Sequence, residues 1–260
     1  MSAEAAYFLP DGERFVPTEL TRGPWSRLHQ HGGPPAALLA RAMEMRAPER
    51  RLARMTVELL RPVPIAPLTV TVDALWTGKR VERLTATLRH DGDAVAHAVG
   101  VLLRPQPVDV PARPARAAPA SPEASRPFNF SFFGEPVTYD TSVEVRIARG
   151  TWGSGEVFAW MRPRVPLVAG ETPSAMQRVL IVADSGSGIS AIDVARYAAI
   201  NPDLTVYLHR PPEGEWIGLE AVTVHEPVGV GLADTGLCDT RGPIGRALQS
   251  LVVESRAEPW

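Results

Sequence analysis

The sequence is short of cysteine and of long apolar runs. Cys238 is its single cysteine, so neither an intramolecular disulfide nor a cluster of thiolate zinc ligands can form, which predicts a reducing environment and an inert thiol. No run approaches the roughly 18 apolar residues of a membrane span. Residues 1–10 lack a basic segment followed by an apolar stretch. We therefore expect a soluble, cytoplasmic protein without a membrane partner.

An excess of charge is also absent. The formal net charge is −2, and 22% of the residues are charged, so there is no overall basic surface of the kind that binds nucleic acid. His29 and His31 stand two residues apart, which invites a metal site. No third ligand with recognisable spacing accompanies them, so we expect no metal and no cofactor.

The length and the distribution of proline indicate two domains. A chain of 260 residues exceeds the usual size of one domain. Residues 105–127 are rich in Pro, Ala and Arg and have no amphipathic period, which is typical of a semi-rigid linker. We predict an N-terminal domain at 1–104, a linker at 105–127 and a C-terminal domain at 128–260.

The two predicted domains repeat one another. TVELLRP at 56–62 matches TVYLHRP at 205–211, a shift of 149 residues. Further on, Asp91-Gly92 matches Arg241-Gly242, with the shift increased by one. This self-similarity indicates an internal duplication.

Each half is predicted to contain one buried helix among antiparallel strands. Glycine and proline open an apolar helix over 32–43, and Thr172 is expected to cap a second helix that has Pro173 in its first turn and runs to about Asp184. The fold class is therefore α+β, an antiparallel sheet wrapped around a long central helix in each half. Strands are expected at 15–22, 55–60, 68–79, 81–103 (folding back at 91–92), 141–148, 157–164, 204–210, 216–224, 231–238 and 244–254.

Five segments carry a resemblance to a known family. They are HGGPPAALLARA at 31–42, LLRP at 59–62, VLIVADSGSGIS at 179–190, NPDLTVYLHRPPEGEW at 201–216 and GRALQSLVV at 245–253. In this order they resemble the double-hotdog acyl-CoA thioesterases of the thioesterase II type, over essentially the whole chain. The resemblance implies two tandem hotdog domains that hydrolyse the thioester of an acyl-CoA substrate, as part of fatty acid metabolism.

The resemblance also implies an active site in the second domain. There, an acid at the end of the helix, a small hydroxyl residue and a glutamine on the last strand position a water. Asp184 and Gln249 fill the first and last places. Asn201 stands where the family usually has Thr, and its amide can both donate and accept hydrogen bonds. These three are the expected catalytic residues.

The residues themselves offer independent reasons and open alternatives. A carboxylate at a helix C-terminus meets the negative pole, which costs about 0.3–1 kcal/mol; Asp184 therefore needs an offset, or lies instead in a solvated turn. Gln249 alternates with Ala247 and Leu251 on a face that should point inward. A buried amide without hydrogen-bonding partners costs about 1–3 kcal/mol. Gln249 therefore needs such partners, unless it is half exposed at a sheet edge.

The repeat adds a further clue. Leu52 occupies the position that matches Asn201, and Val99 the position that matches Gln249. Polar residues in only one copy are expected if that copy alone does chemistry. Drift in a surface loop would also explain Leu52.

The expected substrate-binding residues are His31, Gly32, Gly33 and Arg210. The N–H groups of Gly32 and Gly33, at a buried helix start, suit a developing oxyanion, although glycines before two prolines also simply punctuate a helix. Arg210 is a candidate for binding a phosphate or a structural carboxylate. SGSG at 185–188 does not complete the G-x-S-x-G of serine hydrolases and is interpreted as helix termination.

Two other functions remain open. One is a catalytically silent acyl-CoA-binding protein, which the asparagine at position 201 would favour. The other is a hotdog enoyl-CoA hydratase, whose loop is similar to NPDL at 201–204 but contains a histidine that this sequence lacks. Acyl chain length cannot be read from the sequence. Two fused domains are compatible with a monomer or with a homo-oligomer.

Overall fold

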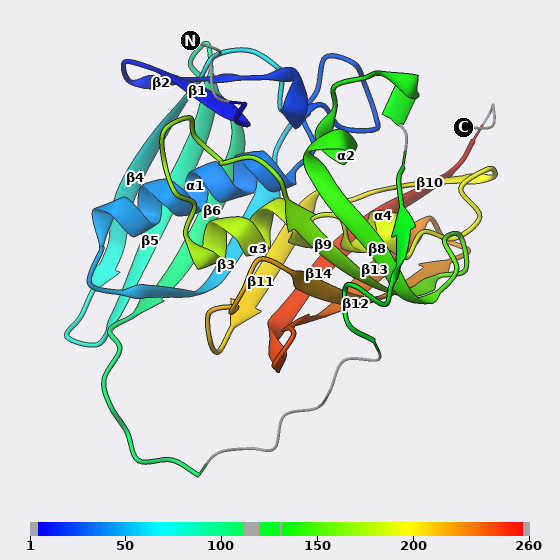
Figure 1. Ribbon diagram of the computed structural model, residues 1–260. Coiled ribbons are helices and arrows are strands. Elements are labelled where there is room, and N and C mark those ends of the chain that lie inside the picture. Colours follow the sequence, from blue (N-terminus) through cyan, green and yellow to red (C-terminus); the bar gives the residue numbers. More distant parts are fainter. Residues whose placement is uncertain (1–4, 112–119, 131, 257–260) are drawn as a thin grey trace.

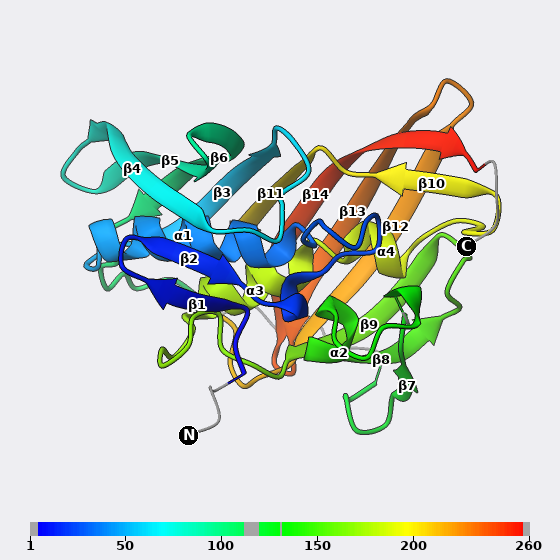
Figure 2. The same ribbon diagram turned by 90° about the horizontal axis from the view of Figure 1, so that it is seen from above.

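The computed structural model describes residues 5–111, 120–130 and 132–256. In these residues the chain forms one antiparallel sheet of 14 strands, against which lie the two longest helices, α1 (Gly33–Arg46) and α3 (Ala175–Ala183). Figure 1 shows α1 and α3 side by side in front of the sheet, and the view from above shows the strands curving around them (Figure 2). No described helix is long and apolar enough to cross a membrane.

The two halves contribute their strands in corresponding orders. Across the sheet the order is β1-β2-β4-β5-β6-β3-β11-β14-β13-β12-β9-β8-β7, and β10 pairs with β14. The first half contains β1 (Phe8–Asp11), β2 (Arg14–Pro17), a 3-10 turn (Glu19–Thr21), β3 (Arg51–Leu59), β4 (Leu68–Thr77), β5 (Val81–His90) and β6 (Asp93–Leu103). The second contains β7 (Arg126–Phe128), a 3-10 turn (Phe132–Gly134), α2 (Tyr139–Ser142), β8 (Val143–Gly150), β9 (Glu156–Pro163), α4 (Gly186–Ile189), β10 (Tyr197–Ile200), β11 (Asp203–Leu208), β12 (Ile217–Glu226), β13 (Val230–Asp239) and β14 (Gly242–Ser255).

The helix α1 forms where the sequence predicts it and is buried as expected. Pro34 and Pro35 stand in its first turn, where the missing backbone N–H would have no helical partner in any case. The alanine and leucine run over 36–40 that follows is at most 1% exposed. Burial of this apolar run, rather than a single amphipathic face, holds the helix against the sheet.

The helices α1 and α3 run antiparallel with their backbones in contact. A Cβ atom on Gly33 would stand 2.2 Å from the carbonyl oxygen of Ile181. At the other end of the pair, Ser174 and Gln177 at the start of α3 each donate a side-chain hydrogen bond of 2.8 Å to Glu44 Oε2 near the end of α1. The start of each helix therefore lies beside the end of the other.

The internal duplication is visible in the register of the sheet. The halves join where β3 pairs with β11, and Thr56 stands opposite Thr205, its counterpart in the repeat. Their Oγ1 atoms are 3.1 Å apart. Thr56 and Thr205 are 149 residues apart in the sequence. The strands β4 and β12 begin and end 149 residues apart as well, and so do β5 and β13.

Two details of the predicted repeat alignment are wrong. β3 places Thr56 opposite Val99, and β11 places Thr205 opposite Leu248, so the counterpart of Val99 is Leu248. Gln249 corresponds to Gly100. The turn at 91–92 likewise corresponds to 240–241. The last pair before the turn is His90 with Asp93 in the β5–β6 hairpin and Asp239 with Gly242 in the β13–β14 hairpin, at the same separation of 149 residues. The shift therefore stays constant through this hairpin.

Several predicted boundaries also need correction. Ser174, not Thr172, caps α3, because its hydroxyl accepts from the Gln177 N–H at 3.1 Å, so Pro173 precedes the helix. The strand expected at 15–22 is split into β2 and a 3-10 turn. SGSG at 185–188 does not end helical structure, since 186–189 form α4. The predicted linker overlaps β7 at its end, and part of it lies outside the described residues.

The helix contact predicts a large effect of a single methyl group. Gly33→Ala should lower the free energy of unfolding by about 3 kcal/mol, because overpacking here meets backbone atoms that cannot rotate away. Urea denaturation of the two proteins measures this difference. The control is Gly188→Ala in α4, where nothing lies within 4 Å of the added Cβ and stability should be unchanged or rise by up to about 1 kcal/mol. Equal midpoints for Gly33→Ala and the parent protein would contradict the contact.

Candidate active site at the end of α3

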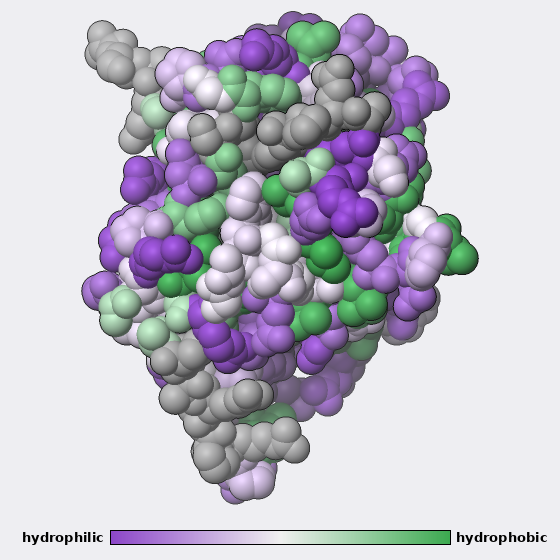
Figure 3. All heavy atoms as spheres, turned by 90° about the vertical axis from the view of Figure 1, so that its right-hand side faces the viewer, coloured by the Kyte–Doolittle hydropathy of each residue, from purple (hydrophilic) through white to green (hydrophobic). Residues whose placement is uncertain are grey.

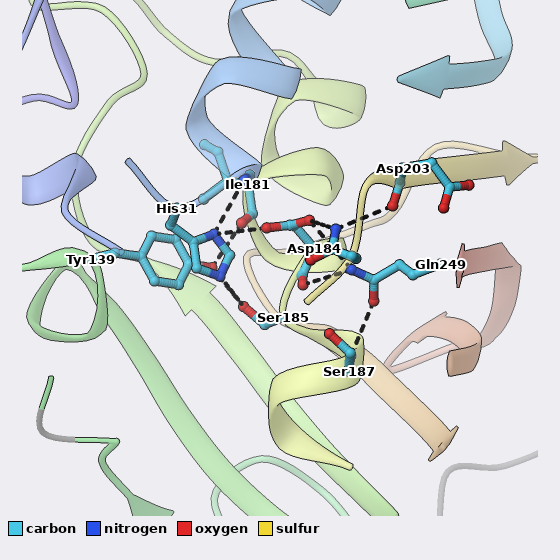
Figure 4. Close-up of polar contacts among 10 residues, drawn as sticks. His31, Tyr139, Ile181, Asp184, Ser185, Ser187, Asp203 and Gln249 are labelled. Atoms are coloured by element: carbon cyan, nitrogen blue, oxygen red, sulfur yellow. Dashed lines mark hydrogen bonds and ion pairs between the residues drawn. The ribbon is translucent and has the colours of Figure 1, made fainter. Parts of the chain in front are cut away.

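Asp184, Asn201 and Gln249 come together around one carboxylate oxygen. Asn201 Nδ2 donates to Asp184 Oδ1 at 2.8 Å, and Gln249 Nε2 donates to the same atom at 3.3 Å. Figure 4 shows Gln249, on β14, directed at Asp184, which follows α3. The structure therefore brings together the three residues that the sequence singled out.

The carboxylate of Asp184 is buried, so the solvated turn considered as an alternative is wrong. Asp184 is the C-cap residue of α3 and is 6% exposed. The antiparallel pairing places it at the start of α1, where a Cβ atom on Gly32 would stand 2.7 Å from Asp184 Oδ2. The positive end of the α1 dipole thus offsets the negative end of α3.

Gln249 is also buried, as its strand alternation predicts, with an exposure of 1%. Its Nε2 donates to the Asp184 carbonyl oxygen at 3.1 Å as well as to the carboxylate, and its Oε1 accepts from the Ser187 N–H at 3.0 Å. Both ends of the amide are therefore satisfied by the protein. These contacts tie the end of α3 and the start of α4 to β14.

Asn201 stands where the strand of the second half is interrupted. In the first half β3 runs unbroken through Leu52, the counterpart of Asn201, whereas the second half is divided into β10 and β11 at Asn201-Pro202. Proline has no N–H for a strand ladder. Asn201 Nδ2 uses its second proton on the Asp203 carbonyl oxygen at 3.1 Å, which leaves its Oδ1 directed to no donor among the described residues.

The first half has apolar surroundings at Leu52 and Gly100, the positions that match Asn201 and Gln249. A Cβ atom on Gly100 would stand 2.6 Å from Met43 Sδ and 2.8 Å from Leu52 Cδ1. Leu52 lies in β3 and is 5% exposed, so drift in a surface loop does not explain it. Where the second half has a carboxylate between two amides, the first half has packed side chains.

His31 joins the carboxylate from the other side. Its Nδ1 lies 3.2 Å from Asp184 Oδ2, and it also accepts from the Gly33 N–H at 3.1 Å. The ring stacks on Tyr139, with 3.7 Å between centroids and 5° between planes. Burial lowers the pKa of His31 below its ordinary value, although Asp184 opposes the shift. The sequence carried no signal for Tyr139, which comes from a separate helix, α2.

A cavity of about 460 Å³ opens beside this cluster. Asp184, Asn201, His31 and Gly32 lie in its lining, whereas Gln249 lies behind Asp184 and contributes no lining atoms. Most of the remaining wall is apolar, and two arginines are among its lining residues. The aromatic residues and arginines of the lining are Trp25, Phe130, Trp152, Tyr197, Arg61 and Arg256.

Arg210, the fourth predicted binding residue, lies outside this group. It forms a two-pronged ion pair with Asp239, including a 2.7 Å contact from Nη2 to Oδ1, and does not line the cavity. Of the two roles weighed for Arg210, the structural one is therefore observed. Burial raises the pKa of the adjacent Cys238 to about 12, so its thiol stays protonated. Among the described residues, no three His, Cys, Asp or Glu are grouped to hold a metal ion.

Comparison with known proteins agrees with this architecture. The acyl-CoA thioesterase C-terminal domain matches residues 107–253, and the acyl-CoA thioesterase N-terminal domain matches residues 21–103. The chain therefore belongs to the acyl-CoA thioesterase family. No curated protein sequence matches it significantly.

Solved structures show the same fold over nearly the whole chain. A proposed thioesterase II from Thermobifida fusca YX is 17% identical, with a TM-score of 0.76 over 97% of this chain and 96% of that one. A conserved protein of unknown function with a hot dog fold, from Alicyclobacillus acidocaldarius, is 18% identical, with a TM-score of 0.73 over 96% of each chain. The acyl-CoA thioesterase II TesB2 of Mycobacterium marinum is 14% identical, with a TM-score of 0.68 over 92% of this chain and 97% of that one. The fold is thus the hot dog fold.

The Arg210–Asp239 pair predicts a loss of stability without a loss of binding. Asp239 is fully buried, and Arg210→Met should cost about 2–4 kcal/mol because it leaves that carboxylate unpaired. The KM for acyl-CoA should not change. Arg246→Met, which removes an exposed pair with Asp234, is the control and should cost less than about 1 kcal/mol.

The pair should also make stability depend on pH. Burial disfavours the Asp239 carboxylate, but Arg210 more than offsets this and holds the pKa below its ordinary value near 3.8. Its contribution is therefore present above that pH and is lost as the pH falls through the lower, folded-state pKa. Thermal unfolding between pH 5 and pH 2 measures it, and an equal acid sensitivity in Arg210→Met would contradict the assignment.

Proposed function

We propose that this protein hydrolyses the thioester of an acyl-CoA to the free acid and CoA, at the site around Asp184. Membership of the acyl-CoA thioesterase family supports the substrate class. The observation that carries the proposal is the convergence of Asn201 and Gln249 on one oxygen of a buried carboxylate beside an apolar cavity. The apolar contact of Met43, Leu52 and Gly100 supports a single such site, in the second half.

The proposed architecture is a double hotdog, in which each half wraps part of the sheet around its own central helix. The two units would span 1–104 and 128–260, with 105–127 as the connection. The paired strands β3 and β11, with Thr56 opposite Thr205, support this division, because two units related by a twofold axis meet there through equivalent residues.

In the proposed mechanism, the Asp184 carboxylate acts as general base toward a water. Asn201 lines the same cavity, and its Oδ1 atom can accept the second hydrogen of that water. Gln249 acts through Asp184: its two contacts hold the end of α3 and the carboxylate in place. The water attacks the thioester carbon, and the thiolate departs readily without a strong acid.

The oxyanion that forms on the thioester oxygen needs a donor. Gly32, at the start of α1, lines the cavity beside the Asp184 carboxylate. An N–H group at a helix N-terminus suits a developing negative charge. The apolar wall would hold the acyl chain, and the two arginines of the lining would bind the phosphates of CoA.

The rival functions have less support. Asn201 donates a hydrogen bond directly to Asp184. The asparagine therefore preserves the polar site, whereas a catalytically silent binding protein would not need to preserve it. The Asp203 carboxylate, which a hydratase would need in the cavity, accepts from the Ser250 N–H at 2.8 Å instead. A cytoplasmic location, a place in fatty acid metabolism and a homo-oligomer stay predictions.

The proposal predicts which side chains turnover requires. With a panel of acyl-CoAs from short to long, thiol release by Asp184→Asn should fall by about 10³-fold or more, since a general base contributes roughly 10²–10⁴-fold. Gln249→Ala should lower kcat by about 10²-fold with little change in KM, because it misplaces the base. Asp73→Asn, on an exposed part of β4, is the control and should match the parent protein.

Two results would argue against hydrolysis at this site. Near-parental turnover by a folded Asp184→Asn protein would exclude the assigned base. Tight binding of a non-hydrolysable acyl-CoA, with no turnover of any thioester by the parent protein, would favour the silent binding protein.

A further inference from the structure

One buried histidine has no part in the hydrolysis as described. His31 is 8% exposed. Its Nδ1 atom lies 3.1 Å from the Gly33 nitrogen and 3.2 Å from Asp184 Oδ2. A backbone N–H only donates and a carboxylate only accepts, so one protonation state of Nδ1 cannot satisfy both partners.

Hydrogen bonds on the far side of the ring determine the state of Nε2. The Tyr139 hydroxyl lies 2.7 Å from the Ile181 carbonyl oxygen, which only accepts, so the tyrosine donates there. Ser185 Oγ lies 2.9 Å from the same hydroxyl and must donate its proton to it. His31 Nε2, 3.5 Å from Ser185 Oγ, is then the donor of the last and longest link (Figure 4).

Two states of His31 follow from this chain. In the neutral imidazole the proton is on Nε2, and the bare Nδ1 accepts from the Gly33 N–H. In the imidazolium both nitrogens carry protons, and Nδ1 donates to Asp184. The Gly33 N–H already donates to Nδ1, and Asp184 Oδ2 lies within ion-pairing distance of the same atom, so a small rotation of the ring or of the carboxylate exchanges one partner for the other.

We propose that His31 is the proton carrier of this hydrolysis, taking up through Asp184 the proton that the attacking water releases. The proposal rests on the proposed function, because it requires Asp184 to act as the base. Transfer from Asp184 Oδ2 to His31 Nδ1 returns the carboxylate to its ionised form while the tetrahedral intermediate exists. His31 would thus be a catalytic residue and not only part of the substrate-binding wall.

The step balances without any other reactant. One O–H bond of water breaks as the new C–O bond forms, and the proton passes to Asp184 and on to His31. When the intermediate collapses, the C–S bond breaks and its electron pair leaves on sulfur. The proton then returns from His31 through Asp184 to the thiolate, which gives the free acid and the CoA thiol.

Transfer of the proton to His31 also frees the Gly33 N–H group. A protonated Nδ1 can no longer accept from Gly33, so that N–H loses its partner when negative charge forms on the thioester oxygen. Gly33 is the first residue of α1 and directly follows Gly32, which lines the cavity, so its N–H lies next to the place proposed for the oxyanion. Proton uptake and oxyanion binding are thereby coupled through one ring atom.

The groups around His31 set the expected pH dependence. Burial lowers its pKa below 6.5, and the carboxylates of Asp184, at the end of α3, and Asp140, in α2, offset this only in part. Burial also keeps the pKa of Tyr139 well above 10, so its phenol remains a donor. Above pH 6.5 His31 is therefore neutral and able to accept a proton. As the pH falls through its lowered pKa, it is protonated in advance and turnover is lost.

The decisive variant is His31→Asn, measured by thiol release across pH. The asparagine carbonyl can still accept from the Gly33 N–H, but it cannot carry a proton. We expect kcat to fall by about 10²-fold with KM nearly unchanged, and the part of the acidic limb that is due to His31 to disappear. Added imidazole should restore part of the turnover of His31→Ala, in proportion to the free base. His97→Asn, on β6 among Thr85 and Thr87, is the control.

A direct observation on the parent protein guards against variants that fail to fold. Nitrogen-15 NMR of labelled histidine at pH 8 should show His31 as the Nε2–H tautomer. The Nδ1–H tautomer, parental turnover in His31→Asn, or a loss of turnover that leaves the acidic limb unchanged and resists imidazole would each overturn the proposal. An active Asp184→Asn protein would instead refute the hydrolytic site itself.

Discussion

The backbone contact between the start of α1 and the end of α3 is the constraint on which the site depends. No side chain separates the helices at Gly33, where a Cβ atom would meet the Ile181 carbonyl oxygen. Because the helices run antiparallel, residues that follow one helix stand at the free N–H groups of the other. Both helices are buried in one apolar core, so the sheet that encloses them also holds their ends in place.

This arrangement explains why an acid can lie at each helix end. A carboxylate at a helix C-terminus is unfavourable, but the N-terminus of the antiparallel neighbour provides the opposite partial charge. Glu44, near the end of α1, lies at the positively polarised start of α3, where Ser174 and Gln177 donate hydrogen bonds to it. Asp184 uses it at the start of α1, but its carboxylate also opens on a cavity. The same electrostatic device therefore serves stability at one end of the helix pair and, as we propose, chemistry at the other.

The two halves differ most where their shared pattern is interrupted. Pro202 ends the strand that runs unbroken in the first half, and the break directs Asn201 to the carboxylate. Where the second half has Gln249, the first has Gly100, and the side chains of Met43 and Leu52 fill the space beside it. A buried polar group is tolerated only with its partners, so the three polar residues belong together, as do the three apolar ones.

The sequence by itself determined the α+β class, the buried helix α1, most strands and the internal repeat, because these depend on local periodicity and turn residues that a single segment carries. It also singled out Asp184, Asn201 and Gln249, through a family resemblance and, for Gln249, through strand alternation.

The local pattern misplaced the repeat partner of Gln249 by one residue, since a one-residue slip in a strand is settled only by the pairing of neighbouring strands. The stacking of Tyr139 on His31, the pairing of Arg210 with Asp239 and the burial of Asp184 were decided by the tertiary structure alone. Each depends on segments distant in sequence, whose contact follows from how the helices and sheet pack.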